Sequence, residues 1–145
     1  MKISVVTGSR ADFGLLEWPI KLLQAAPFFE VEVLRVWDMK FYAAYNQILS
    51  LSVPERRPDA LLLLGDRFEI MACATAAHLN RIPIAHIGGG DVTEGSYDDA
   101  MRDAISRMAS IHFVTSTSAM ARLTHMGYRN VHLVGSPGID YIKHA

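Results

Sequence analysis

"ALLLLGDRF", residues 60–68, is the stretch that decides the fold. Its first five residues are apolar without any alternation, which is typical of a strand that is covered on both faces, as in parallel sheets. A glycine, an acid and a base follow at once, so polar side chains begin where the strand ends.

Short apolar runs alternate with helical patterns along the whole chain. Strands are expected at 3–7, 31–36, 60–64, 84–87, 112–115 and 131–134, and helices near 15–25, 42–53, 67–79, 97–110 and 117–126. Pro19 is expected to kink or shorten the first helix, while Ser116 or Thr117 should cap the last one and Gly127 should follow it. The alternation predicts an α/β fold, a doubly wound, Rossmann-like parallel sheet with right-handed crossovers.

Composition narrows the class of protein. The 145 residues suit one domain, and the net charge of −1 argues against nucleic acid or an anionic membrane as a partner. No apolar run is long enough to cross a membrane, and no signal peptide is apparent. The single cysteine, Cys73, lies in an apolar stretch where burial is expected, and it fits a reducing compartment. We therefore expect a cytoplasmic protein.

Ligands of doubly wound sheets bind beyond the carboxyl ends of the strands. In "TGSRADFG" (7–14), Arg10 stands at a helix start, where it could bind an anion; the alternative is a tight turn capped by Asp12. Asp66 and Arg67 follow the buried strand, although Asp66 could instead cap the next helix. Asp38 is expected to be a solvated surface acid.

"IAHIGGGDVTEGSYDD" (84–99) combines three glycines with clustered acids. Glycines 88–90 remove side chains from the loop and so allow a ligand close to the backbone. Carboxylates favour proton transfer over phosphate binding, although early helical acids also suit the helix dipole, which makes one of Asp98 and Asp99 structural. His86, at the strand end, is equally compatible with a core histidine and a functional one. No His/Cys spacing matches a metal site.

Four segments together give the chain a family likeness: "VVTGSRADFGLL", "RPDALLLLGDRFE", "IPIAHIGGGDVTEGSYDDAMRDAISRMASIHFVTS" and "VHLVGSPGID". They resemble the hydrolysing UDP-N-acetylglucosamine 2-epimerases, in the branch that serves sialic-acid and related nonulosonic-acid pathways. The resemblance implies an N-terminal lobe of a glycosyltransferase-B-like, two-lobed protein. It also implies a reaction in which UDP is eliminated from the sugar nucleotide to leave a glycal. Water is then added to the glycal to give N-acetylmannosamine, and no metal or nicotinamide cofactor takes part.

The resemblance assigns residues by position. Arg10 corresponds to an arginine near the nucleotide, Asp66 to a catalytic aspartate, and Asp98 to the acid of the Asp-Asp pair that opens the next helix. Gly88 stands where well-studied members have a catalytic glutamate, so Asp91 or Glu94 substitutes for it, this branch runs differently, or the chain is impaired. The family's extended loop after the second strand is missing or shortened near 37–41.

Two sets of site residues follow. The expected catalytic residues are Asp66, Asp91, Glu94 and Asp98, and the expected substrate-binding residues are Arg10, Arg67, His86, Gly88, Gly89, Gly90 and Ser136. The expected partners are a UDP-sugar, the C-terminal lobe of the same protein, which these residues do not include, and further copies in a homo-oligomer.

Three other functions remain open. One is an epimerase acting on another UDP-2-acetamido sugar, such as a diacetylated bacillosamine derivative. Another is a non-catalytic nucleotide-sugar binding module. The third is a nicotinamide-binding Rossmann domain, against which the lack of a Gly-x-Gly-x-x-Gly first turn argues.

Overall fold

A computed structural model of the chain describes residues 1–93 and 98–144. Its six strands form one parallel sheet in the order β2-β1-β3-β4-β5-β6. The strands are β1 (Lys2–Thr7), β2 (Glu30–Arg35), β3 (Ala60–Leu64), β4 (Ile84–Ile87), β5 (Ile111–Val114) and β6 (Val131–Leu133). The helices are α1 (Arg10–Ala25), α2 (Phe41–Leu49), α3 (Phe68–Leu79), α4 (Asp98–Met108), α5 (Thr117–His125) and α6 (Pro137–His144).

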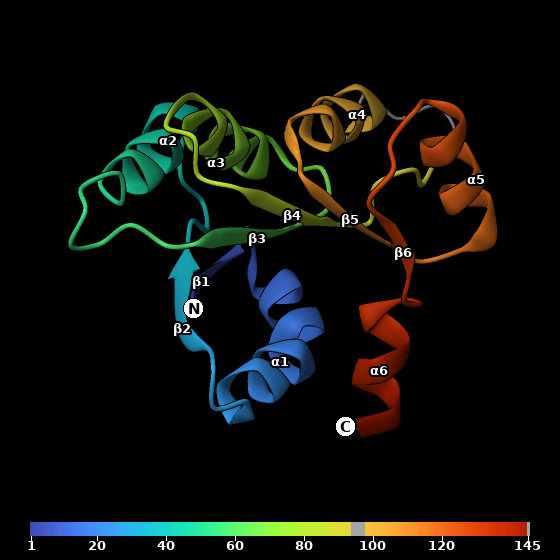
Figure 1. The fold of residues 1–145 in the computed structure, drawn as a ribbon, viewed down its shortest axis with the longest axis horizontal. Coiled ribbons are helices and arrows are strands. Elements are labelled where there is room, and N and C mark those ends of the chain that lie inside the picture. The colour runs from blue at the N-terminus through green and yellow to red at the C-terminus, as the bar shows by residue number, and fades with distance from the viewer. Residues whose placement is uncertain (94–97, 145) are drawn as a thin grey trace.

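The winding direction changes at β1, the strand from which the chain leaves toward β2 and beside which it later returns as β3. Helices therefore lie on both faces of the sheet: α2 to α5 on one face, α1 and α6 on the other (Figure 1). The predicted doubly wound, Rossmann-like fold is confirmed.

Alternating burial explains the unbroken apolar run of β3. Leu61 and Leu63 pack into the core beneath α2, α3 and α4, whereas Leu62 packs on the opposite face with α1. A strand between two covered faces has no solvent side, so it needs no polar alternation. Cys73 lies in the first of these cores and is fully buried, as expected.

The observed helix ends agree with the local sequence signals in one helix and differ from them in another. The last predicted helix is confirmed as α5, because Ser116 Oγ accepts from the backbone N–H of Ala119 at 3.1 Å and Gly127 follows with φ of 96°. The first helix was predicted to begin too late: Ser9 caps α1 by accepting from the N–H of Asp12 at 3.1 Å. The helix continues through Pro19 to Ala25, so the predicted shortening is wrong.

One helix was not predicted at all. α6 begins at Pro137, and proline suits a first helical position because its missing N–H would have no intrahelical partner there. Ser136 supports this start, since its Oγ accepts from the N–H of Gly138 at 3.2 Å.

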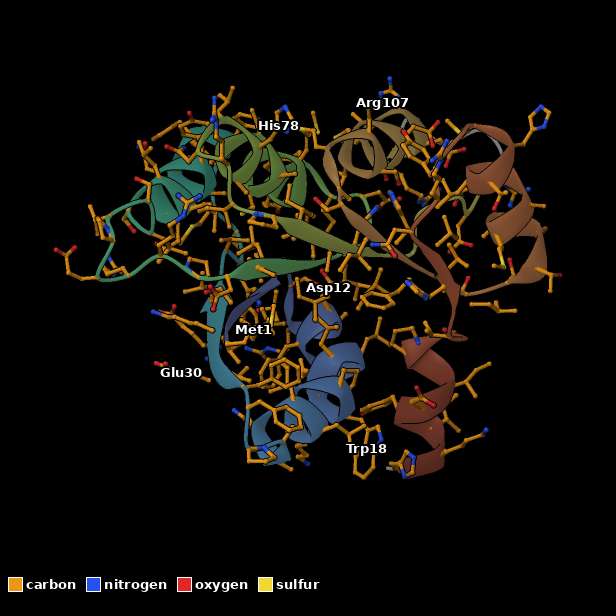
Figure 2. The ribbon with its side chains drawn as sticks, in the orientation of Figure 1. Met1, Asp12, Trp18, Glu30, His78 and Arg107 are labelled. Carbon is orange, nitrogen blue, oxygen red and sulfur yellow. The ribbon has the colours of Figure 1, made fainter. Side chains whose placement is uncertain are left out.

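The sheet face between α1 and α6 is incompletely covered. A cavity of about 670 Å³ lies there, with an apolar lining that includes Leu22, Leu62 and Phe113, and with Asp140 as its acidic residue. Trp18 extends from α1 toward α6 and stacks on His144, with ring centroids 3.9 Å apart (Figure 2). This apolar groove is poorly suited to a nucleotide sugar, which needs polar partners.

Candidate active site at the carboxyl edge of the sheet

The carboxyl ends of β3, β4 and β5 bring together side chains that are far apart in the sequence. Asp66 follows β3, the glycine loop with Asp91 follows β4, and Thr115 follows β5. These strands are neighbours in the sheet, so their ends meet along one edge.

Arg102 on α4 links these elements. Its guanidinium donates to the carboxylates of Asp66 and Asp99 and to the backbone carbonyl of Asp91, the last at 2.6 Å. The side chain is only 9% exposed. This buried cation holds the end of β3, the loop and α4 in fixed positions relative to one another. If any of the three acceptors moved away, the positive charge of the guanidinium would be left buried without a full set of partners.

Sequence reasoning missed Arg102. Arg102 follows Asp99 by three residues, which is the spacing of an ion pair on one helix face, so this signal could have indicated a role for Arg102. Its pairing with Asp66 crosses 36 positions of sequence and could not be read locally.

Asp66 is held by an ion pair with Arg102 and does not cap the next helix. Its carboxylate bonds Arg102, whereas α3 begins at Phe68 and receives no side-chain cap from the preceding residue. Burial raises the pKa of Asp66, Arg102 opposes that rise, and the charges of Asp98 and Asp99 add to it. A carboxyl group whose pKa is raised exchanges its proton closer to neutral pH, as general acids and bases do.

The remaining predicted acids differ in the contacts that their carboxylates make. Asp91 accepts from Thr115 Oγ1 at 3.0 and 3.3 Å, so its carboxylate is held against the end of β5. Asp98 lies close enough to Asp66 for its charge to affect that carboxyl group. Asp99 also accepts from the backbone N–H of Thr93 at 3.1 Å, which gives it a structural role. Glu94 lies outside the described residues.

The three glycines are buried, and two of them have a packing reason. A Cβ on Gly89 would come within 2.6 Å of Ser106 Oγ, and a Cβ on Gly90 within 2.6 Å of the Ala119 carbonyl oxygen. Gly88 differs, since the nearest atom to its Cβ would be 3.9 Å away, but its φ of 93° favours glycine. The loop is therefore packed against α4 and α5 at Gly89 and Gly90, whereas a Cβ on Gly88 would lie at ordinary van der Waals distance from its neighbours.

His86 lies beneath this loop. It is fully buried, with Nε2 2.7 Å from the Gly65 carbonyl oxygen and Nδ1 3.1 Å from Ser106 Oγ. Burial lowers the pKa of His86 to about 4, so the ring is neutral at neutral pH. Because a carbonyl can only accept, Nε2 carries the proton and Nδ1 accepts from the serine hydroxyl. This arrangement holds the turn before Asp66 and exposes no ring atom for the predicted substrate contact.

The side chains of the other predicted substrate-binding residues make their contacts elsewhere. Arg67 pairs with the buried Glu69 at 3.1 Å. Arg10 is exposed at the start of α1, with its Cζ 5.9 Å from the ring centroid of Trp37. Ser136 supports the start of α6. Residues 1–93 and 98–144 contain no group of three or more His, Cys, Asp or Glu side chains arranged to hold a metal ion.

Comparison with known proteins is decisive for the family. The family model described as UDP-N-acetylglucosamine 2-epimerase matches residues 39–145. The chain belongs to this family. It is 30% identical over 174 residues to the UDP-N-acetylglucosamine 2-epimerase of Neisseria meningitidis, an alignment that covers 96% of this chain and 46% of that protein.

A second relative from the epimerase family has a different name. The chain is 32% identical over 181 residues to the UDP-N,N'-diacetylbacillosamine 2-epimerase (hydrolyzing) of Legionella pneumophila, covering 97% of this chain and 47% of that protein. The chain thus spans about half the length of these curated relatives.

Solved structures of the family share the fold. The structure of UDP-GlcNAc 2-epimerase from Neisseria meningitidis bound to UDP-GlcNAc matches with a TM-score of 0.86 at 21% identity, over 99% of this chain and 48% of that one. The enzyme from Methanocaldococcus jannaschii matches with a TM-score of 0.82 at 17% identity, over 99% and 49%. Within the described residues, no helix combines the length and apolar character needed to span a membrane.

Proposed function

We propose that this chain supplies the proton-transfer half of a hydrolysing 2-epimerase that acts on UDP-N-acetylglucosamine. The observation that carries the proposal is the Asp66 carboxyl group at the end of a buried parallel strand, held by Arg102 and close to Asp98. Family membership supports the same reaction class.

The chemistry that fits is a proton removal next to a leaving group. One carboxylate takes the proton from C2 while the bond from C1 to UDP breaks, which gives a glycal. Addition of water, with a proton returned to C2 from the opposite face, gives free N-acetylmannosamine. Asp66 and Asp98 are the candidates for these proton transfers, and Asp91 is held nearby by Thr115.

A second lobe completes this proposal. The chain spans about half of its relatives, and the carboxyl edge of its sheet is where a ligand would lie between two such lobes. The diphosphate would then be shared with the other lobe, while the acids of this one face the sugar.

A second substrate is favoured by one specific observation. Two relatives, from Legionella pneumophila and Campylobacter jejuni, are named for N,N'-diacetylbacillosamine nucleotides, and the first is 32% identical to this chain. An additional acetamido group would change the sugar end of the substrate, which is the part that we place beside Asp66 and the glycine loop.

The test is incubation of the full product of the gene that encodes this chain with each nucleotide sugar in deuterium oxide. Release of UDP together with a 2-epimeric free sugar carrying deuterium at C2 is the expected result, and the preferred substrate is the one with the higher kcat/KM. Tight binding of UDP without any sugar release would instead identify a binding module.

A further inference from the structure

The carboxylate of Asp91 is held by a hydroxyl group rather than by a cation. Thr115, the first residue after β5, has its Oγ1 3.0 Å from Asp91 Oδ1 and 3.3 Å from Oδ2, and donates to the carboxylate. Among the residues that the structure describes, this hydroxyl is the one hydrogen-bond partner of the carboxylate, and no cation pairs with it. Asp66 is different, since its carboxylate is paired with Arg102.

The backbone around Asp91 is also fixed. Arg102 of α4 donates to the Asp91 carbonyl oxygen at 2.6 Å, and Arg122 of α5 donates to the carbonyl oxygen of the preceding residue at 2.5 Å. At the start of the loop, the N–H of Gly88 donates to the Phe113 carbonyl oxygen at 3.0 Å and so continues the pairing of β4 with β5. Because the loop is tied to the sheet and to two helices, the Asp91 carboxylate has a defined position before any ligand binds.

This position places Asp91 across the end of β4 from Asp66. A Cβ on Gly88 would lie 4.0 Å from Asp91 Oδ2 and 3.9 Å from the backbone nitrogen of Gly65, the residue before Asp66. β4 lies between β3 and β5 in the sheet (Figure 1). Asp66 therefore stands on the β3 side of the β4 end, and the carboxylate of Asp91, which is partly exposed, bonds Thr115 on the β5 side.

A hydroxyl partner suits a carboxyl group that has to gain and lose a proton. A threonine hydroxyl donates to an ionised carboxylate, and after rotation it can accept from a protonated one, so it can hold both forms in one position. A guanidinium group can only donate, and its charge favours the ionised form. The two acids are thus held in different ways within one site.

We propose that Asp91 is a further proton-transfer group of this site and that Thr115 positions its carboxyl group in both protonation states. The assignment rests on the proposed function, in which one proton leaves C2 and another returns to C2 from the opposite face. Asp98 lies near Asp66, because its charge raises the pKa of that carboxyl group. Asp91 is the described acid at this edge that bonds the end of β5, so it is placed to serve the face that Asp66 does not.

The proton balance of the reaction requires two such groups. In the elimination, one carboxylate takes the C2 proton, the electron pair of the C2–H bond forms the C1–C2 double bond, and the bond from C1 to UDP breaks. In the hydration, a protonated carboxyl group on the other face gives its proton to C2 while water adds to C1 and loses a proton to solvent. The two groups end with their protonation states exchanged, and proton exchange with solvent restores them.

The test measures formation of the free 2-epimeric sugar from UDP-N-acetylglucosamine by the full gene product. Asp91→Asn should lower kcat roughly 10²–10⁴-fold with little change in KM, because the amide still accepts from Thr115 but cannot transfer a proton. Thr115→Val removes the hydroxyl at nearly constant shape and should lower kcat about tenfold at a similar KM, because the carboxyl group is no longer held in place. Thr115→Ser keeps a hydroxyl and should recover most of the lost rate.

A double substitution separates positioning from a merely structural role. If Thr115 acts through Asp91, Thr115→Val should cause no further loss of kcat in an Asp91→Asn background. Thr117→Val makes the same change at an exposed threonine two residues further along and should leave kcat unaltered. Urea denaturation reports the stability of each variant. Asp91→Asn keeps the shape of the side chain, so it decides the assignment even where Thr115→Val does not fold.

Near-normal kcat in Asp91→Asn, or an equal loss from Thr115→Val with and without the Asp91 carboxylate, would overturn the inference. Release of UDP and the free sugar by the wild type would then leave the proposed function intact. A wild type that releases no sugar would overturn the proposed function and, with it, this assignment.

Discussion

Arg102 on α4 donates to the Asp66 carboxylate at the end of β3, 36 residues earlier in the chain. The same guanidinium bonds Asp99 and the loop carbonyl of Asp91. One buried cation therefore sets both the position and the charge environment of the acid that we propose to transfer protons.

Replacing Asp66 should separate catalysis from folding. Asp66→Asn in the full gene product is expected to lower kcat for UDP release by roughly 10²–10⁴-fold, because the amide cannot take or give the proton. Circular dichroism should show an unchanged fold, since the amide oxygen can still accept from Arg102. Asp103→Asn, an exposed acid on the same helix α4, is the control. Full activity with reduced stability would reassign Asp66 to a structural role.

Replacing Arg102 should instead affect stability. Arg102→Met leaves the partly buried carboxylates of Asp66 and Asp99 without their cation, so the free energy of unfolding should fall by about 3 kcal/mol. Arg102→Lys should cost less, because one ammonium group can retain part of the pairing. Urea denaturation measures both, with the exposed Arg129→Met expected to change stability by less than about 0.5 kcal/mol. Equal effects at positions 102 and 129 would contradict a central role for this cation.

The buried His86 predicts a particular pH dependence. Burial lowers its pKa from 6.5 to about 4, so between these values the unfolded chain binds more protons than the folded one. The free energy of unfolding should therefore fall as the pH is lowered from 6.5 to 4, by about 3 kcal/mol from this group. His86→Gln removes that contribution. Denaturation curves of wild type and variant should diverge across this window, and parallel pH profiles would refute the argument.

Placing a glutamate at position 88, where the family resemblance leads us to expect one, should not raise activity. Gly88 has φ of 93°, so any side chain there should cost about 1–3 kcal/mol in backbone strain even though its Cβ would meet no atom closer than 3.9 Å. A carboxylate would also lie near Asp91, whose Oδ2 is 4.0 Å from the Cβ position, and like charges compete for one proton.

Gly88→Ala separates these two effects, because it introduces the strain without the charge. Both variants are compared with wild type for stability and for UDP release by the full gene product. An inactive wild type that becomes active with Gly88→Glu would mean that the natural chain has lost its catalytic acid.

The fold could be predicted from the sequence because its strongest signals are local. The unbroken run at 60–64 and the turn residues after each strand place the sheet, and Ser116 and Gly127 mark the ends of α5. One of the errors has a local cause and the other a tertiary one. Because Ser9 caps α1, the helix begins earlier than predicted. The helix also continues through Pro19, which indicates that packing against the sheet outweighs the loss of one helical hydrogen bond.

The candidate site was only partly accessible to such reasoning. The position of Asp66 at a strand end follows from the sheet alone, but its bond to Arg102 depends on how α4 lies over the loop. The same holds for Gly89 and Gly90: the sequence pattern predicts space for a ligand, whereas their missing side chains make room for α4 and α5. Packing between distant segments decides these roles, and no local pattern encodes it.

The apolar groove between α1 and α6 has a practical consequence in the laboratory. Dyes such as anilinonaphthalene sulfonate fluoresce when they enter apolar clefts, and a cavity of about 670 Å³ is large enough to admit one. The native chain should therefore be bright with such a dye before any heating. Melting curves that depend on dye uptake would start from a high baseline, so ellipticity at far-ultraviolet wavelengths is the sounder way to follow its unfolding.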